Sequence, residues 1–292
     1  MTASTSQRGI LNPRVGAEHF QLSRHAPADD LAPWVERHWL IRWDLRGQPP
    51  FRQEVLSHPC VNVVIQAGCT AAHGVTSGRF ATVLSGEGQV VGTKFRPGAF
   101  YPFVGVSMAN LTDRSIPLAT LFGSAGAALE PAVLDEPDPQ AQIALVEAFW
   151  RERLPPPDAS VDIVVRVVQL ALEQRDLVRV DELCARADVP LRALQRLFRR
   201  YVGVSPKWVL RRFRLHEAAE RIADGGSVDW SALAHELGYC DQSHFVHDFK
   251  AQVGCLPSEY QARCAGRGPC APMISAGPAA SAAGPPASPS SA

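Results

Sequence analysis

The segment LCARADVPLRALQRLFRRYVGVSP, residues 183–206, resembles the later segment LAHELGYCDQSHFVHDFKAQVGCLP, residues 233–257. In each segment the apolar spacing predicts a short helix, a tight turn and a second helix that ends at a glycine. The matched pairs are Leu183 and Leu233, Val189 and Tyr239, Leu194 and Phe245, and Phe198 and Phe249. This repeat predicts two helix-turn-helix units, whose second helices have the size to enter a major groove.

A long helix is predicted between the two copies. Ser205 provides an N-cap, Pro206 suits the first helical position, and Gly225 with Gly226 ends a helix that runs through Ala223. A single copy would suit an ordinary helical bundle equally well. Two copies in this register, joined by one helix, favour the DNA-reading motif over that alternative.

The first copy carries a run of basic residues. The chain has 29 basic and 29 acidic side chains, so its formal net charge is zero. Between Leu191 and Arg214, however, basic residues stand without any acidic one among them. They are Arg192, Arg196, Arg199, Arg200, Lys207, Arg211, Arg212 and Arg214. An unpaired basic face on a neutral protein indicates a polyanionic partner, and nucleic acid is the obvious candidate.

Helical spacing assigns roles within the first recognition helix, predicted at about 191–201. The expected buried stripe is Leu194, Leu197, Phe198 and Tyr201. The side chains expected to contact bases are Arg192, Gln195 and Arg196, because Arg pairs with guanine and Gln with adenine. Those expected to contact phosphate are Arg199, Arg200 and Lys207. The alternative is that all of them touch only phosphate.

The second recognition helix, predicted at about 242–253, differs in chemistry. Its expected base-contacting positions are Gln242, Ser243, Val246 and His247, with Asp241 and Asp248 nearby. Across 231–263 there are two basic and four acidic residues. We therefore expect the first unit to dominate affinity and its salt dependence, while the second adds sequence preference.

The helical region, in particular RALQRLFRRYVGVSPKWVLRRFRLHEA and LAHELGYCDQSHFVHDFKAQVGCLPSEY, resembles the double helix-turn-helix domain of the AraC/XylS family of bacterial transcription regulators. The resemblance covers roughly residues 160–263. It implies two recognition helices in adjacent major grooves on one face of the DNA, held apart by the linker helix, and hence an asymmetric site. The chain departs from the family at Pro190, where many members have serine, and at His247, where many have arginine.

Residues 1–135 have short apolar runs separated by glycine and proline, at 61–66, 79–84 and 89–95, which favour a small antiparallel sheet or barrel. We predict an α+β multidomain protein, with a β-rich, barrel-like N-terminal domain followed by an all-α double helix-turn-helix domain. The expected boundaries are a sensor-like domain at 1–135, an amphipathic helix and Pro-rich hinge at 136–159, the DNA-binding domain at 160–264 and a disordered Ala/Pro/Ser/Gly tail at 265–292.

The front region, through Trp34–Leu45, VNVVI and Val90–Leu118, resembles a poorly characterised sensor-like domain attached to some members of the family. That resemblance implies a cupin-like barrel able to hold a small-molecule effector. The aromatic residues numerous enough to line a pocket are Trp34, Trp39, Trp43, Phe95, Phe100, Tyr101 and Phe103, and Arg96 could anchor an acid. Such aromatic residues more commonly pack in a core, and such an arginine more commonly pairs locally. We therefore predict no particular ligand-binding residue.

An enzyme is the runner-up interpretation, in the form of a metal-dependent cupin-like protein with a DNA-binding appendage. His58, His73 and Glu87 are available as ligands, but no HxH pair accompanies them. The seven cysteines form no CxxC pair, and we expect them to be reduced and structural. We predict a protein without catalytic residues, metal or cofactor. A third interpretation is an architectural protein that binds nucleic acid without sequence preference.

The expected partner is double-stranded promoter DNA, with RNA polymerase as a second partner if the protein is an activator. No apolar run approaches the ~20 residues of a membrane span, and the start MTASTSQRGILNPRVG lacks a secretory apolar core, so we expect a cytoplasmic protein without a membrane partner. The amphipathic stretch Ile143–Trp150 raises the hypothesis of a homodimer. It could equally cap the core of the front domain.

Overall fold

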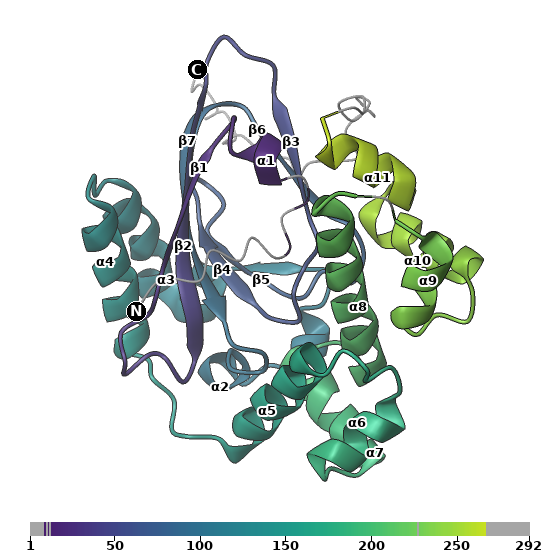
Figure 1. Ribbon diagram of the computed structural model, residues 1–292. Helices are drawn as coiled ribbons and strands as arrows, with labels where there is room; N and C mark the ends of the chain where they lie inside the picture. The colour runs from purple at the N-terminus through teal and green to yellow at the C-terminus, as the bar shows by residue number, and fades with distance from the viewer. Residues whose placement is uncertain (1–8, 10, 12, 227, 267–292) are drawn as a thin grey trace, which may run out of the picture.

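In the computed structural model, which describes residues 9, 11, 13–226 and 228–266, a β-rich front half packs against a helical back half (Figure 1). The strands are β1 (Gln21–His25), β2 (Val35–Leu45), β3 (Phe51–Val55), β4 (Asn62–Ile65), β5 (Ala71–His73), β6 (Phe80–Leu84), β7 (Gly86–Phe95) and β8 (Ser115–Pro117). The described part of the chain contains a six-stranded antiparallel sheet, in the order β1-β2-β7-β4-β5-β8, and a β3-β6 pair. The predicted fold class is confirmed.

The centre of the sheet depends on large residues that face glycines. In the β2–β7 pair, Trp39 lies opposite Gly92 and Trp43 opposite Gly88. A Cβ atom at either glycine would overlap the indole ring of its partner. Because Gly88 and Gly92 have no side chains, the two indole rings can lie flat across strand β7. The rings then cover the backbone that the glycines would otherwise leave exposed.

Short elements and two helices complete the front half. They are α1 (Pro13–Gly16), α2 (Tyr101–Val104), the 3₁₀ turn η1 (Met108–Asn110), α3 (Leu118–Leu134) and α4 (Pro139–Arg151). The sequence predicted α4 but not α3, which is rich in alanine and glycine and is interrupted at Gly123, where φ is +60°. Glycine weakens a helix in isolation, so packing on the sheet must stabilise α3.

The apolar face of α4 lies against the front core. Ile143, Val146, Phe149 and Trp150 are buried, and the Trp150 ring meets Phe95 edge to face at 5.0 Å. The stretch Ile143–Trp150 thus covers the core of the front domain, which is the second of the two roles that its sequence suggested. The face that suggested a homodimer is thus covered within the chain, apart from Leu145, which is 38% exposed.

The back half is helical. Its elements are α5 (Ala159–Glu173), α6 (Val180–Ala187), α7 (Leu191–Leu197), the π-helical turn η2 (Phe198–Val202), α8 (Pro206–Ala223), α9 (Trp230–Glu236), α10 (Gln242–Val253) and α11 (Pro257–Cys264). The bounds predicted for α8 and α10 agree with the structure. The first recognition helix differs, because it widens at η2, where the Gly203 amide donates to Phe198 O at 2.8 Å.

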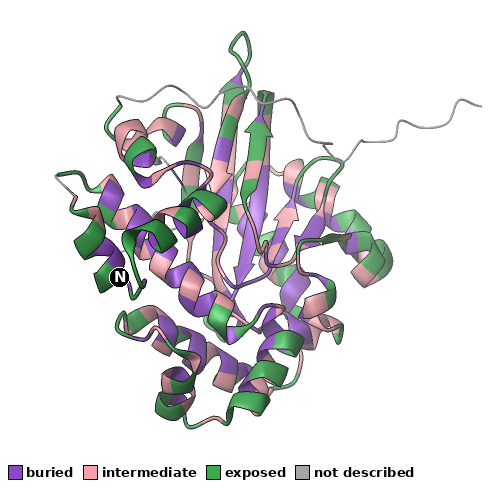
Figure 2. Cartoon of the chain, turned by 90° about the vertical axis from the view of Figure 1, so that its right-hand side faces the viewer, coloured by how far each residue is buried: buried purple, intermediate pink, exposed green. Residues whose placement is uncertain are grey.

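One buried apolar cluster crosses from the front half into the back half. It includes Phe95 and Phe100 from the front and Val164 and Phe198 from the back. Figure 2 shows buried positions along the inner strands and along the helix faces that meet them. The two halves therefore share a core, and the first helix-turn-helix unit is packed on the front domain.

Several remaining predictions concern the chain's ends and cysteines. The predicted disordered tail lies outside the described residues from 267 onward, as does Cys270, while Ala265 and Gly266 form a turn after α11. The six cysteines within the described ranges are free thiols. No helix that the structure describes is long and apolar enough to cross a membrane.

Candidate DNA interface

The first helix-turn-helix unit consists of α6, the turn at Asp188 and α7. Asp188 takes the left-handed conformation, with φ of +52°, and Pro190 precedes α7 without a side-chain cap. The predicted inward positions are buried at Leu194, Phe198 and Tyr201, whereas Leu197 is half-buried. This packing fixes which face of α7 reaches solvent.

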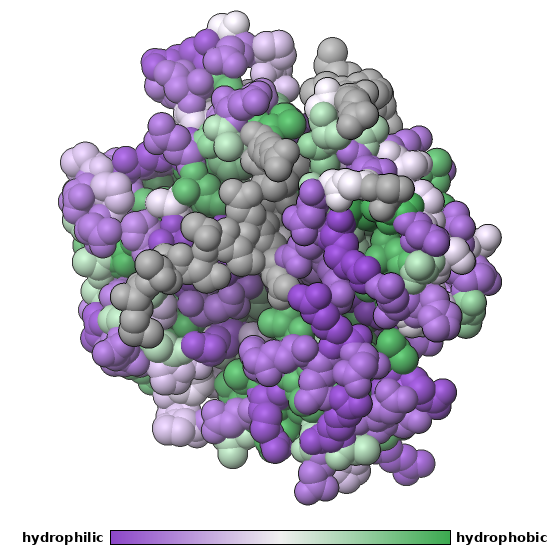
Figure 3. All heavy atoms as spheres, in the orientation of Figure 1, coloured by the Kyte–Doolittle hydropathy of each residue, from purple (hydrophilic) through white to green (hydrophobic). Residues whose placement is uncertain are grey.

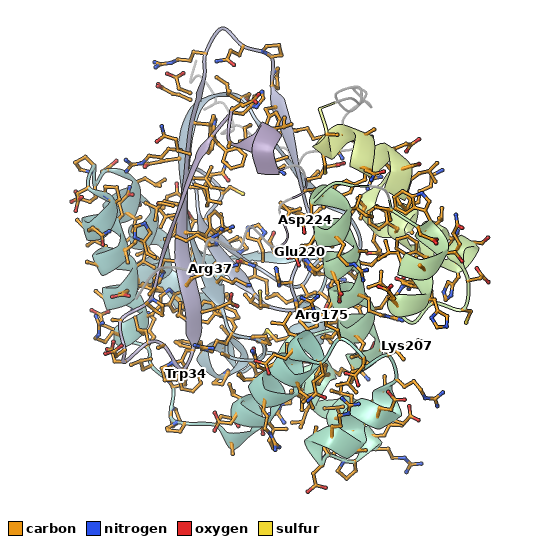
Figure 4. The ribbon with its side chains drawn as sticks, in the orientation of Figure 1. Trp34, Arg37, Arg175, Lys207, Glu220 and Asp224 are labelled. Atoms are coloured by element: carbon orange, nitrogen blue, oxygen red, sulfur yellow. The ribbon has the colours of Figure 1, made fainter. Side chains whose placement is uncertain are left out.

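The outward face of α7 carries the predicted DNA-contacting side chains. Arg192, Gln195, Arg196 and Arg199 are exposed, as is Lys207 at the start of α8. Their side chains make no hydrogen bond or ion pair with any residue that the structure describes. Figure 3 shows hydrophilic side chains gathered over the lower right of the molecule, where α6 and α7 lie, and Figure 4 shows Lys207 on that side of α8. The geometry leaves these donors available to a ligand.

Four of the eight basic residues have partners within the chain, so the expectation that the whole run forms an unpaired basic face is wrong. Arg211 Nε donates to Asp248 Oδ2 at 2.7 Å, and Arg214 Nη1 donates to the carbonyl oxygens of Leu237 and Gly238, each at 3.3 Å. These acceptors belong to the second unit. The ion pair with Asp248 raises the pKa of Arg211.

Arg212 is 1% exposed and points into the molecule. Its Nη2 donates to Ser77 O at 2.9 Å and to Gln252 Oε1 at 2.9 Å, while its guanidinium lies 4.4 Å from the centre of the Trp208 ring. Burial lowers the pKa of Arg212 to about 10, although the carboxylates of Asp248 and Asp113 act in the opposite direction. Arg212 therefore connects the front domain, the linker helix and α10 inside the molecule, and it is not part of the DNA face.

Arg200 is held by the front domain. Its Nε donates to the Tyr101 hydroxyl at 2.6 Å, its Nη2 contacts the same oxygen, and its guanidinium lies 4.8 Å from the Tyr101 ring centre. The hydrogen bond to Tyr101 raises the pKa of Arg200. Its predicted phosphate contact would require this side chain to leave Tyr101. Within the described chain, the unpaired cations of the basic run at 191–214 are therefore Arg192, Arg196, Arg199 and Lys207.

The second unit presents a more neutral face. Asp241 caps α10, since its Oδ1 accepts from the His244 amide at 2.7 Å. Gln242, Ser243 and His247 are exposed, whereas Val246 is half-buried and packs against the core of this unit. Val246 can therefore offer only part of its side chain to DNA.

Asp248 does not face outward, which corrects the expectation that it adds negative charge beside α10. It is 1% exposed and accepts from the Tyr239 hydroxyl at 2.8 Å as well as from Arg211. Burial raises the pKa of Tyr239, and the neighbouring Asp248 adds to that effect. The ion pair leaves the surface of the second unit less acidic than its sequence indicates.

The aromatic side chains of the front domain pack against one another. Trp34 and Phe103 meet edge to face at 5.8 Å, and Phe95 and Phe100 do so at 4.9 Å. Arg96 Nε donates to Ala32 O at 2.6 Å. For Trp34, Phe95, Phe100, Phe103 and Arg96, these contacts correspond to the packed-core and local-pairing alternatives.

The residues considered as metal ligands do not meet. His58 stacks on His216 with ring centres 4.4 Å apart, His73 lies on β5 opposite Asn62, and Glu87 pairs with Arg46 at 3.0 Å. Among the described residues, no three His, Cys, Asp or Glu side chains are grouped so as to hold a metal ion. The arrangement offers no support for the metal-dependent alternative.

Comparisons with known families bear on both halves. A family described as "Helix-turn-helix domain" matches residues 183–263, and a "Domain of unknown function (DUF6597)" matches residues 23–117. The HTH-type transcriptional activator RhaS of Pectobacterium carotovorum subsp. carotovorum (strain PC1) is 32% identical over 75 residues, which are 26% of each chain. The match thus spans about a quarter of that relative's length.

Solved structures of ToxT from Vibrio cholerae show low similarity to this chain. ToxT of strain SCE256 with an unsaturated fatty acid bound is 11% identical, with a TM-score of 0.37 over 92% of this chain and all of that one. A 1.65 Å structure of ToxT is 14% identical, with a TM-score of 0.36 over 83% of this chain and 98% of that one.

Proposed function

Because residues 183–263 form a helix-turn-helix domain, we propose that this protein is a sequence-specific DNA-binding transcription regulator of the AraC/XylS type. The observation that carries the proposal is the outward face of α7. Arg192, Gln195 and Arg196 stand together there, exposed and without a partner in the described chain. Such side chains on a second helix of this motif are suited to the edges of base pairs in a major groove.

The exposed side chains of the first unit divide into two roles. Arg192 and Arg196 would each pair with guanine O6 and N7, and Gln195 with adenine N6 and N7. Arg199 and Lys207 lie nearer the end of the helix and the start of α8, where phosphate contacts fix the register. In this proposal, sequence preference and electrostatic affinity come from different residues.

The second unit would read a neighbouring groove. Its base-contacting candidates are Gln242, Ser243 and His247, with a smaller contribution from the half-buried Val246. Lys250 is the exposed cation on α10. With little charge to attract DNA, this unit would contribute preference for particular bases more than affinity.

Regulation through the front domain belongs to the same proposal, because that domain touches both units. A small-molecule effector is a hypothesis that rests on the resemblance of the front domain to a sensor-like domain, since the family matched at 23–117 has no described function. RNA polymerase would be a partner if the protein activates transcription. A second copy is not needed for two-groove reading, since one chain holds both units. We propose a non-enzymatic protein that acts in the cytoplasm, where a bacterial promoter lies.

The test is an in-vitro selection of random duplex DNA on the full chain, read by sequencing and repeated with Arg196→Ala. We expect an asymmetric motif with two boxes about one helical turn apart (~10 bp). The variant should lose preference at one position of one box while the other box is retained. Salt-sensitive binding without any enriched motif would contradict the proposal and favour the architectural interpretation.

A further inference from the structure

Both recognition helices end at a left-handed glycine, and the front domain touches both ends. At the end of η2, Gly203 has φ of +96°, and Thr112 Oγ1 donates to its carbonyl oxygen at 2.8 Å. A Cβ atom on Gly203 would lie 2.6 Å from Met108 O. The first unit is therefore in close backbone contact with the segment 108–112.

The second contact is made at the end of α10. Gly254 has φ of +92°, and the guanidinium of Arg79 occupies the space that a side chain there would take. Arg79 Nη2 also donates to Glu54 Oε1 at 3.1 Å, which holds the guanidinium against the turn. Two separate segments of the front domain thus reach equivalent turns of the two units.

Asp113 and Ser77 join these two segments. Asp113 follows Thr112, and its Oδ1 and Oδ2 accept from the Ser77 amide at 2.7 Å and the Ser77 hydroxyl at 2.6 Å. Asp113 adopts φ of +58°, a conformation that costs energy for a residue with a side chain. The surrounding contacts hold it in this position.

Ser77 also contacts the linker helix between the two units. Its carbonyl oxygen accepts from Trp208 Nε1 at 3.1 Å and from Arg212 Nη2 at 2.9 Å. The same Nη2 atom reaches Gln252 on α10. A continuous chain of contacts therefore runs from the end of the first recognition helix, through Asp113 and Ser77, to the linker helix and the second recognition helix.

We propose that Asp113 and Ser77 are positioning residues that fix the distance and angle between α7 and α10, and so set the spacing of the two DNA boxes that the chain accepts. This inference rests on the proposed function, because it concerns how two base-reading helices are held. The linker helix α8 begins just after Gly203 and contacts α10 through Arg211 and Arg212. The front domain adds contacts at both glycine turns that end the reading helices.

The physical consequence concerns DNA geometry. Inserting one base pair moves the second box about 3.4 Å along the axis and turns it by roughly 35°. Rigidly held helices cannot follow that change without losing contacts in one groove. Loosely held helices can follow it, so the strength of this connection determines how strictly the chain discriminates between spacings.

The test uses the full chain with Asp113→Gly, which keeps the left-handed conformation accessible and removes the carboxylate, and with Ser77→Ala. Asp113→Asn serves as the conservative variant, because asparagine tolerates positive φ and retains one acceptor oxygen. Asp44→Asn is the matched control, since Asp44, near the exposed end of β2, pairs with Arg46 alone among the described residues. Binding is measured on the selected site and on versions with one base pair inserted or removed between the boxes.

We expect Asp113→Gly to lower the discrimination between spacings by about tenfold, within the range for residues that share one hydrogen-bond network. Ser77→Ala should lower it less, because alanine loses only the hydroxyl bond to Asp113 and keeps the backbone amide and carbonyl contacts. Base preference inside each box should stay as in the parent protein, Asp113→Asn should be intermediate, and Asp44→Asn should match the parent. A role in stability alone would lower affinity for every spacing equally. Either that outcome or a uniform gain in affinity at all spacings would overturn the inference.

A second measurement does not depend on DNA. Hydrogen exchange of the Gly203 and Gly254 amides, which donate to Phe198 O and Lys250 O, should increase together in Asp113→Gly and in Ser77→Ala. If the parent protein selects no DNA motif, the regulator proposal fails, and exchange still decides whether the turns are connected. Unchanged exchange at both turns would overturn the inference. If Asp113→Gly does not fold, Ser77→Ala decides by both measurements.

Discussion

The two helix-turn-helix units share one skeleton and stabilise it with different chemistry. In the first unit, Val189 and Leu197 are partly buried and pack against the main core. At the equivalent positions of the second unit, the Tyr239 hydroxyl donates to a buried Asp248, which also binds Arg211 from the linker helix. An apolar repeat can therefore specify a backbone motif without determining whether the contacts inside it are apolar or polar.

The outward positions differ in the same way. Arg192, Arg196 and Arg199 in α7 correspond in register to Ser243, His247 and Lys250 in α10. The two helices also differ at their N-termini. Asp241 caps α10 with its side chain, whereas Pro190 at the equivalent position provides no side-chain cap for α7. The first unit therefore carries more charge, and the second carries more local hydrogen bonding at its helix start.

The largest expected effect is on stability, from Arg211→Ala. Loss of one partner from a fully buried ion pair costs about 3–5 kcal/mol. Because the Arg211 side chain is 43% exposed and Asp248 keeps its bond from Tyr239, we expect about 2–3 kcal/mol here. Urea unfolding of the full chain would measure it. Leu197→Ala, at the position in the first unit that matches Asp248, should cost only about 1–2 kcal/mol because that side chain is half-buried.

A cost of Arg211→Ala below that of Leu197→Ala would contradict the assignment of a polar interior to the second unit. Arg211→Lys provides a control. It retains a positive charge but offers no planar pair of donors to the two oxygens of Asp248, so its cost should fall between those of the parent and the alanine variant.

Base reading is the next comparison. Arg196→Ala should weaken binding to the selected site by about 1–3 kcal/mol and relax preference at one base. His247→Ala, at the matching position of α10, should have less effect, since imidazole cannot form the bidentate pair that a guanidinium forms with guanine. Titrating each protein variant against the selected DNA site and its single-base variants would measure both losses of binding free energy. A larger loss from His247→Ala than from Arg196→Ala would reverse the ranking of the two units.

The helix starts provide a smaller effect. Asp241→Ala should lower the free energy of unfolding by about 1 kcal/mol, because the His244 amide loses its acceptor. Asp241→Asn should stay near the parent value, as asparagine is an equally good cap. Pro190→Ser would add a cap to α7 and also relax the unfolded chain, so we expect a net change close to zero. Equal losses from Asp241→Ala and Asp241→Asn would show that charge, not capping, matters there.

The smallest effect should appear in the salt dependence of DNA binding. Each lost phosphate contact reduces the slope of log K against log salt by about 0.9. Arg199→Ala and Lys207→Ala should each show this reduction on every DNA sequence alike, whereas Lys250→Ala should show less. Equal slopes for the Arg199 and Lys250 variants would mean that both units contact the backbone with similar strength.

Much of the helical half follows from the sequence because its signals are local. The Ser205 cap, Pro206 and the glycine pair at 225–226 define α8, and apolar spacing defines α6 and α10. Local signals are weak for α3, whose glycines disfavour a helix in isolation, and for α11, which is a short helix after Pro257. These two helices depend on the surfaces on which they pack.

The sequence by itself determined the repeat, the face that α7 turns outward and the identity of the side chains on that face, because each follows from helical periodicity over a few residues. Only the tertiary structure decided which of the basic side chains remain unpaired. Arg200, Arg211 and Arg212 bind Tyr101, Asp248 and Ser77, which lie 99, 37 and 135 residues away along the chain. Periodicity carries no information on such partners, because they are brought together by the packing of the two halves on one core.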